Sequence, residues 1–272
     1  MKRLDVIGNV SHDKIRYPDR RTGSRVGGAA LLVALASVKG GRPAAPVCVL
    51  GNDLAHLPEV PGLDAIDWTA HGQVDGFSAS FELEYDAEDE LVAVRPDYGV
   101  AKHLTAHALA HIDRHPQDTY HVCCRRPLDV AAVLTRLAQH NAEFSVDFFL
   151  SSAEEMIRAA AQWLPETTTV FVNAAEYRLL ENFGDPADLP ELVVTNGPRA
   201  AVIRHFGEQT ISVVPPPSTP REVSGAGDTL AGTFLARRSH GATPGQALAE
   251  AAIAAARYVA APSYPMAAPG GG

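Results

Sequence analysis

The most informative segment of the chain reads Ser224-Gly225-Ala226-Gly227-Asp228-Thr229-Leu230-Ala231-Gly232. Its glycines allow a tight turn and a close approach of the backbone to a ligand, and a helix-compatible run follows from Thr229 to Arg238. A helix that begins here directs free N–H groups and the positive end of its dipole at the turn, which makes an anion site from main chain. With a phosphoryl group in the turn and a hydroxyl at Asp228, the segment would serve a phosphotransferase. A helix N-cap is the alternative interpretation, because Asp and Ser are preferred caps.

Composition and charge narrow the class of protein. A chain of 272 residues with 46% apolar residues suits one α/β domain. The net charge of −9 argues against a nucleic-acid partner. We find no signal peptide and no stretch near the ~18 apolar residues of a membrane span, so we expect a cytoplasmic protein without a membrane partner. The sparse cysteines fit a reducing compartment and the role of small buried hydrophobes; they are Cys48, Cys123 and Cys124.

Strand-like and helix-like runs alternate along the chain, which predicts an α/β fold with a mostly parallel sheet. The strand-like runs lie at 4–8, 46–51, 119–124, 144–149, 169–172 and 192–197. The main helix-like runs lie at 26–38, 128–139, 152–162, 229–238 and 244–261. Residues 77–85 alternate between apolar and polar side chains, and 91–95 follow after a polar turn, so these two runs predict a half-exposed antiparallel hairpin. Residues 200–205 and 209–214 predict a second hairpin.

Polar residues follow two of the predicted strands. Asp13 comes shortly after the first strand, and a carboxylate near the carboxyl end of a strand is well placed to bind a ligand in an α/β sheet; a turn residue without a ligand is the alternative. Asn173 and Glu176 follow the strand at 169–172. They can equally form a capping box, in which the Asn caps the helix and the Glu stands three residues on.

These segments, taken in order, resemble the motifs of the ribokinase-like (PfkB) carbohydrate kinases. The matching motifs are Gly-Ala-Gly-Asp at 225–228, Asn-x-x-Glu at 173–176, the strand–Gly–Asp pattern at 8–13 and the double glycine at 27–28. The resemblance implies a ribokinase-like α/β fold, with a central, mostly parallel sheet flanked by helices. It also implies a single kinase domain over 1–262 with a small β-sheet lid, formed by segments at about 14–26 and 75–100, and a flexible tail at 263–272.

The resemblance implies roles for individual residues as well. Asp228 would be the general base, while the backbone of Gly225, Ala226 and Gly227 would hold the developing charge. The acceptor would be bound by Asp13, Asn9, Gly27 and Gly28. The nucleotide would be bound by Asn173, Glu176, Thr195 and Gly197, and Glu176 would support Mg²⁺ through water, since Mg²⁺ prefers oxygen ligands and keeps several waters. ATP and Mg²⁺ are therefore the expected co-substrate and cofactor.

Three positions depart from the family pattern. Leu32 and Phe149 stand where the family often has Asn, and Glu222 stands where it has an Asp that is often tied to a monovalent-cation site. Asp147, in the same segment as Phe149, is expected to orient phosphate or metal. The longer side chain of Glu222 changes the reach of its carboxylate, which places potassium activation in doubt.

The expected function is ATP-dependent phosphorylation of a hydroxyl on a small polyhydroxylated acceptor. The residues at 8–13 and 27–30 look most like the inositol-kinase branch, which favours a cyclitol such as myo-inositol. A sugar or a nucleoside is the alternative acceptor, and a ligand-binding protein that has lost catalysis is the alternative class. Because the family often dimerises through its lid, a homodimer is also expected.

Four histidines stand four residues apart, at 103, 107, 111 and 115, and would align along one side of a helix. Such a pair can bind zinc. The alternative is an exposed face, with Leu104, Ala108, Leu109 and Ile112 turned inward.

Overall fold

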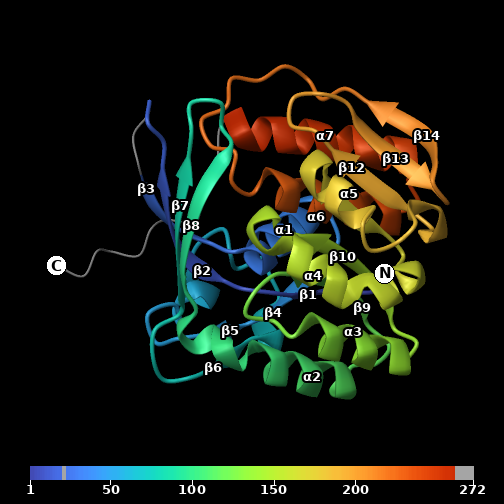
Figure 1. The fold of residues 1–272 in the computed structure, drawn as a ribbon. Helices are drawn as coiled ribbons and strands as arrows, with labels where there is room; N and C mark the ends of the chain where they lie inside the picture. The colour runs from blue at the N-terminus through green and yellow to red at the C-terminus, as the bar shows by residue number, and fades with distance from the viewer. Residues whose placement is uncertain (20–22, 261–272) are drawn as a thin grey trace.

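Eight strands form the central sheet of the computed structural model, which describes residues 1–19 and 23–260 (Figure 1). In spatial order they are β14 (Glu208–Val213), β13 (Ala201–His205), β12 (Leu192–Thr195), β11 (Val170–Asn173), β10 (Glu143–Phe148), β9 (Thr119–Cys124), β1 (Leu4–Ile7) and β4 (Ala44–Val47). The strands from β12 to β4 run parallel, and the hairpin of β13 and β14 adds an antiparallel edge. The α/β fold and the hairpin near 200–214 are thus confirmed.

Helices cover both faces of this sheet (Figure 1). One face carries α1 (Ala29–Lys39), α6 (Ala226–Ser239) and α7 (Pro244–Ala260); the other carries α2 (Leu104–Arg114), α3 (Val130–Gln139), α4 (Ala153–Ala160) and α5 (Ala174–Leu180). Fully buried side chains such as Phe234 on the first face and Leu134 on the second pack between the helices and the sheet. The burial of each contributes about 2–3 kcal/mol to the free energy of folding. Short 3₁₀ helices lie at Leu57–Glu59, Trp68–Ala70, Gly99–His103, Leu150–Ser152, Ala161–Glu166 and Pro186–Asp188.

A second sheet stands beside the first, at the left of Figure 1. Its strands, in spatial order, are β3 (Gly23–Gly27), β2 (Ser11–Arg16), β7 (Ala79–Tyr85) and β8 (Leu91–Asp97). The predicted hairpin is confirmed as β7 and β8, which pair antiparallel. Ile15 and Leu83 are buried on the inner side, whereas Arg95 on β8 is exposed and pairs with Glu82 and Glu84 on β7.

The structure corrects two predicted boundaries. The run at 46–51 is not one strand: β4 ends at Val47, and β5 (Val49–Leu50) pairs with β6 (Gly72–Gln73) in a separate two-stranded sheet, because the carbonyl of Cys48 accepts the N–H of Gly72. The helix expected from Thr229 begins at Ala226, so the glycine-rich segment is itself the first turn of α6.

The predicted tail at 263–272 lies outside the described residues. Within residues 1–19 and 23–260, no helix is both long and apolar enough to cross a membrane.

The row of histidines is anchored rather than wholly exposed. His111 is buried, and its Nε2 lies 2.5 Å from Oδ2 of the fully buried Asp5 on β1. The Nε of Arg3 lies 2.6 Å from the other oxygen of Asp5, and His107 bonds to the carbonyl of Ala70. The interpretation as an exposed face was therefore wrong for His111, because a buried carboxylate at this place needs partners from α2.

We predict that His111→Ala lowers the free energy of unfolding by about 3 kcal/mol, since it takes a hydrogen-bond partner from the fully buried carboxylate of Asp5. Urea unfolding measures this. His103→Ala is the control, because His103 belongs to the same row of histidines but is exposed. Equal losses in both variants would contradict the assignment of Asp5 and His111 as a stabilising pair.

Candidate active site

A cavity of about 490 Å³ lies where the central sheet, the second sheet and the start of α6 meet. Most of the predicted site residues line it: Asn9, Asp13, Gly28, Asn173, Glu176, Thr195, Gly225, Gly227 and Asp228. Three other predicted site residues, all in the described part of the chain, do not line the cavity. Gly27 and Ala226 are next to lining residues in the sequence, and Gly197 lies in the turn after β12. The fold thus gathers residues that are more than 200 positions apart in the sequence into one cavity.

Gly225 sets the geometry at the start of α6. It is the N-cap residue, with a left-handed backbone at φ 92°, and a Cβ there would lie 2.6 Å from both Leu32 Cδ1 and Tyr258 Oη. The N–H of Ala226 donates to the carbonyl of Val223 at 3.1 Å, so it is already occupied. A Cβ on Gly227 would meet open space. We name the turn at 225–227 the anion cradle. Within residues 1–19 and 23–260, its N–H groups without a backbone partner are those of Gly225 and Gly227, whereas that of Ala226 is occupied.

Asp228 is the third residue of α6, not its cap. The N-cap interpretation of this aspartate is therefore wrong. Its side chain is mostly buried and faces the cavity, with Oδ1 3.4 Å from Nη2 of Arg125.

Asp13 lies inside β2 rather than in a turn. It is buried, and its Oδ1 accepts a hydrogen bond from the Ser11 hydroxyl at 2.7 Å. A Cβ on Gly27 would come within 2.1 Å of its Oδ2, so the double glycine makes room for this carboxylate. Burial raises the pKa of Asp13, while Ser11, Arg25 and the N–H of Gly28 oppose that rise.

Nearby, the side-chain nitrogen of Asn9 donates to the carbonyl of Arg126. The Asn9 Oδ1 is buried without a hydrogen-bond partner among residues 1–19 and 23–260.

Arg125 is the main functional residue that the sequence reasoning missed. Its Nη2 lies 2.6 Å from Asp147 Oδ2 as well as 3.4 Å from Asp228 Oδ1, so one guanidinium links two carboxylates. It stacks over the ring of Phe149 at 5.5 Å, a cation–π contact. Burial alone would lower its pKa, but Asp147 and Asp228 raise it above the ordinary value. The available signal was its position directly after β9, at the same edge of the sheet as the predicted ligands.

The capping-box interpretation of Asn173 and Glu176 is correct as geometry. The Asn173 side chain accepts from the N–H of Glu176 at 2.9 Å, and the Glu176 carboxylate accepts from the N–H of Asn173 at 2.8 Å. Both residues also line the cavity, so capping does not remove them from the site. Burial raises the pKa of Glu176 to about 7, and the neighbouring charge of Asp147 adds to the effect.

Asp147 sits on the floor of the cavity among polar groups from two strands. Its Oδ1 is 3.9 Å from Nε2 of His121, and the thiol of Cys123 is close to both. Burial raises the pKa of Asp147, although the positive charge of Arg125 opposes that rise. Burial and the charge of Arg125 both lower the pKa of His121, to about 3, so its imidazole is neutral. All three cysteines are buried, as predicted.

The charges around the cavity fit a divalent cation and a phosphorylated ligand. Four carboxylates, those of Asp13, Asp147, Glu176 and Asp228, share the cavity with the buried guanidinium of Arg125. Asp147 Oδ1 is buried without a hydrogen-bond partner in the described part of the chain. An all-oxygen set with excess negative charge suits Mg²⁺, and the first turn of α6 suits a phosphoryl anion.

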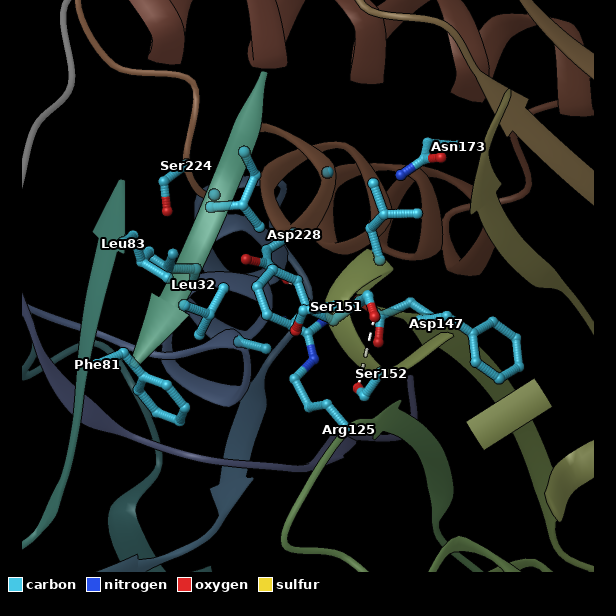
Figure 2. A pocket seen from close by; sticks show the side chains of 18 of the residues that line it. Leu32, Phe81, Leu83, Arg125, Asp147, Ser151, Ser152, Asn173, Ser224 and Asp228 are labelled. Atoms are coloured by element: carbon cyan, nitrogen blue, oxygen red, sulfur yellow. Dashed lines mark hydrogen bonds and ion pairs between the residues drawn. The ribbon is translucent and has the colours of Figure 1, made fainter. Parts of the chain in front are cut away.

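One side of the cavity is apolar. It is lined by Leu32, Phe81, Leu83, Leu91, Val94, Pro96, Tyr98 and Phe149. Figure 2 shows Phe81 and Leu83 on this side, Asp147 and Asn173 on the other, and Asp228 with Arg125 between them. The ring of Phe81 meets that of Tyr98 edge-on at 6.1 Å. Such a wall accommodates a flat apolar group beside the polar centre.

Comparison with known proteins agrees with this geometry. The model of the pfkB family carbohydrate kinases matches residues 1–263. The cytidine kinase of Thermococcus kodakarensis is 26% identical over 254 residues, which cover 88% of this chain and 89% of that protein.

Solved structures share the fold. The nucleoside kinase of Burkholderia thailandensis in complex with inosine superposes with a TM-score of 0.77 at 18% identity, covering 97% of this chain and 94% of that one. A putative ribokinase II from E. coli gives a TM-score of 0.77 at 18% identity, covering 98% and 95%. The predicted ribokinase-like fold is confirmed.

We predict that Glu176→Gln changes the pH dependence of stability. A carboxyl whose folded pKa is raised contributes stability at low pH and loses it as the pH rises through about 7. Gln keeps the capping box but does not ionise. Relative to the wild type, the variant should therefore gain about 2–3 kcal/mol in unfolding free energy between about pH 5 and about pH 8.

Urea unfolding at the two pH values measures this difference. Glu155→Gln, which removes an exposed carboxylate paired with Arg126, is the control. A stability gap between Glu176→Gln and wild type that does not change with pH would show that Glu176 titrates normally.

Proposed function

The chain belongs to the pfkB family of carbohydrate kinases, and we propose from this premise that it transfers the γ-phosphate of ATP to a hydroxyl of a nucleoside. The observation that carries the choice of acceptor is the apolar wall beside Asp13 and Asp228. A nucleoside presents a hydroxylated ribose on one side and a flat, largely apolar base on the other. The ribose would face the buried carboxylates while the base packs between Phe81 and Phe149.

The names of similar proteins support the same acceptor class. The relative from Thermococcus kodakarensis is a cytidine kinase, and the structure from Burkholderia thailandensis is a nucleoside kinase with inosine bound. A cyclitol, which the N-terminal motif favours, carries hydroxyls around its whole ring. It would leave the apolar wall without a matching surface, so we place it second.

The residues suggest how the transfer proceeds. Asp228 accepts the proton of the acceptor hydroxyl while the hydroxyl oxygen attacks the γ-phosphorus, and the bond from that phosphorus to the bridging oxygen of ATP breaks, so that ADP leaves. Asp13 holds a second hydroxyl so that the attacking oxygen is aligned. The N–H groups of Gly225 and Gly227 stabilise the charge that develops on the phosphoryl oxygens. The carboxylates of Glu176 and Asp147 would hold Mg²⁺, which would neutralise phosphate charge.

Arg125 orients the reacting carboxylate in this proposal. Its guanidinium holds Asp147 tightly at 2.6 Å and Asp228 loosely at 3.4 Å. The looser contact leaves Asp228 able to turn toward the acceptor hydroxyl while its negative charge remains compensated.

The departures from the family pattern do not favour a protein that has lost catalysis. Leu32 packs against Gly225, Phe149 stacks on Arg125, and Glu222 bonds to Tyr17. Each of these three departing residues therefore has a structural partner, and the four carboxylates of the cavity are all present.

Dimerisation through the second sheet stays a prediction.

We predict that Asp228→Asn lowers turnover by at least ~10²-fold, because the amide cannot accept the hydroxyl proton. An assay of ADP release with ATP, Mg²⁺ and a panel of nucleosides, sugars and cyclitols measures this. Asp188→Asn, at an exposed site, is the control. Near-normal turnover in Asp228→Asn would rule out the general base, and ligand binding without ADP release in the wild type would favour a binding protein.

We also predict that Phe81→Ser raises KM for a nucleoside by about tenfold, since an aromatic contact contributes on the order of 1 kcal/mol beyond the burial of its area. The KM for ATP should change little. Val92→Ser on the neighbouring strand is the control, because Val92 is 61% exposed. Equal effects on both substrates, or a cyclitol as the best acceptor, would overturn the assignment of the apolar wall to a base.

A further inference from the structure

The segment that leads into the anion cradle is bound to the second sheet through polar side chains. Oε1 of Glu222 accepts the Tyr17 hydroxyl at 2.7 Å and the N–H of Ser224 at 2.8 Å. The carbonyl of Ser224 accepts from Arg25 Nη2 at 3.1 Å and from the Tyr258 hydroxyl at 2.9 Å. The Arg25 side chain is only 5% exposed, and its Nη1 lies 3.8 Å from Glu222 Oε2. A buried guanidinium of β3 is therefore in contact with the residue directly before Gly225.

These groups do not fit the monovalent-cation site that the family resemblance implies at Glu222. Such an ion needs carboxylate and carbonyl oxygens with lone pairs directed at it. Here Glu222 Oε1 already accepts two hydrogen bonds, and the two lone pairs of the Ser224 carbonyl are matched by two donors. The positive charge beside Glu222 is supplied by Arg25.

We propose that the Arg25 guanidinium is a built-in cation that positions the anion cradle in place of a monovalent metal ion, so that this kinase works without potassium. This inference rests on the proposed function only in that the cradle binds a phosphoryl anion. Arg25 is a positioning residue, because it acts through the backbone of Ser224.

The geometry of the peptide bond explains how Arg25 acts on the cradle. The Ser224 carbonyl and the Gly225 N–H belong to one planar peptide and point in opposite directions. Holding the carbonyl against Arg25 and Tyr258 therefore fixes the direction of the Gly225 N–H, one of the donors of the cradle. Gly225 can follow this orientation because its left-handed backbone has no Cβ to clash with Leu32.

Arg25 also reaches the acceptor side of the site. It is the cross-strand partner of Asp13 in the β2–β3 pair, and its charge opposes the rise of the Asp13 pKa that burial causes. One side chain thus connects the acceptor carboxylate to the phosphoryl cradle.

The first test compares salts on the wild-type protein. Tetramethylammonium chloride is replaced by sodium, potassium or caesium chloride. Turnover and the ADP affinity measured by calorimetry should then each change less than about twofold, and the melting temperature by no more than about one degree. A saturable activation or stabilisation by potassium alone would overturn the proposal.

The second test removes the internal cation. Arg25→Met should weaken ADP binding by about tenfold, the size of one lost charged hydrogen bond. Added potassium or low millimolar guanidinium should restore part of that affinity. Arg95→Met is the control, because it removes an exposed arginine from the outer side of the same sheet. It should bind ADP like the wild type and show no rescue.

The outcomes separate this proposal from the proposed function. If no acceptor gives ADP release, the ADP affinities and their salt dependence still test Arg25. If Arg25→Met does not fold, Arg25→Lys, which keeps the charge but not the forked geometry, should show weakened ADP binding with partial rescue. ADP affinity unchanged in a folded Arg25 variant would refute the proposal.

Discussion

The compensation of buried negative charge is the constraint on which the site depends. Four carboxylates enclose one cavity, and an isolated buried carboxylate is costly unless it is paired or neutralised. Arg125 links Asp147 to Asp228, whereas Asp13 relies on Ser11, on a backbone N–H and on the charge of Arg25. Burial raises the pKa of Glu176, and the N–H of Asn173 and the charge of Arg125 compensate its carboxylate only in part. The remaining deficit of positive charge is what a bound Mg²⁺ would supply.

The sequence predicted those parts of the site that follow from local rules. Glycines that require a special backbone, such as Gly225, and polar residues at the ends of strands, such as Asn173, are recognisable because each acts within a few residues of the chain. The alternation of strands and helices likewise predicted the parallel sheet. Local rules placed the start of this helix too late, at Thr229 instead of Ala226, and so left Asp228 outside it, because a glycine-rich turn and a first helical turn look alike in sequence.

The parts that were missed depend on contacts between distant segments. Arg125 gains its role from Asp228, a residue 103 positions away, and His111 is buried because Asp5 lies on a neighbouring strand 106 positions away. The apolar wall combines the second sheet with Phe149, which the sequence marked only as an absent asparagine. Such pairings cannot be deduced from one sequence, since periodicity reports which side of an element is apolar but not what that side faces.

The direct pairing of Asp13 with Arg25 has a consequence for how this protein tolerates insertions and deletions. Residues opposite each other in an antiparallel pair project to the same side of the sheet, and a slip of one residue turns every side chain of the moved strand over. A slip of β3 would therefore remove Arg25 from the cradle and Gly27 from the Asp13 carboxylate in a single event. Changes in the length of the connection between β2 and β3 are acceptable only if this register survives. The register of the β2–β3 pair therefore constrains both the carboxylate on the acceptor side and the anion cradle.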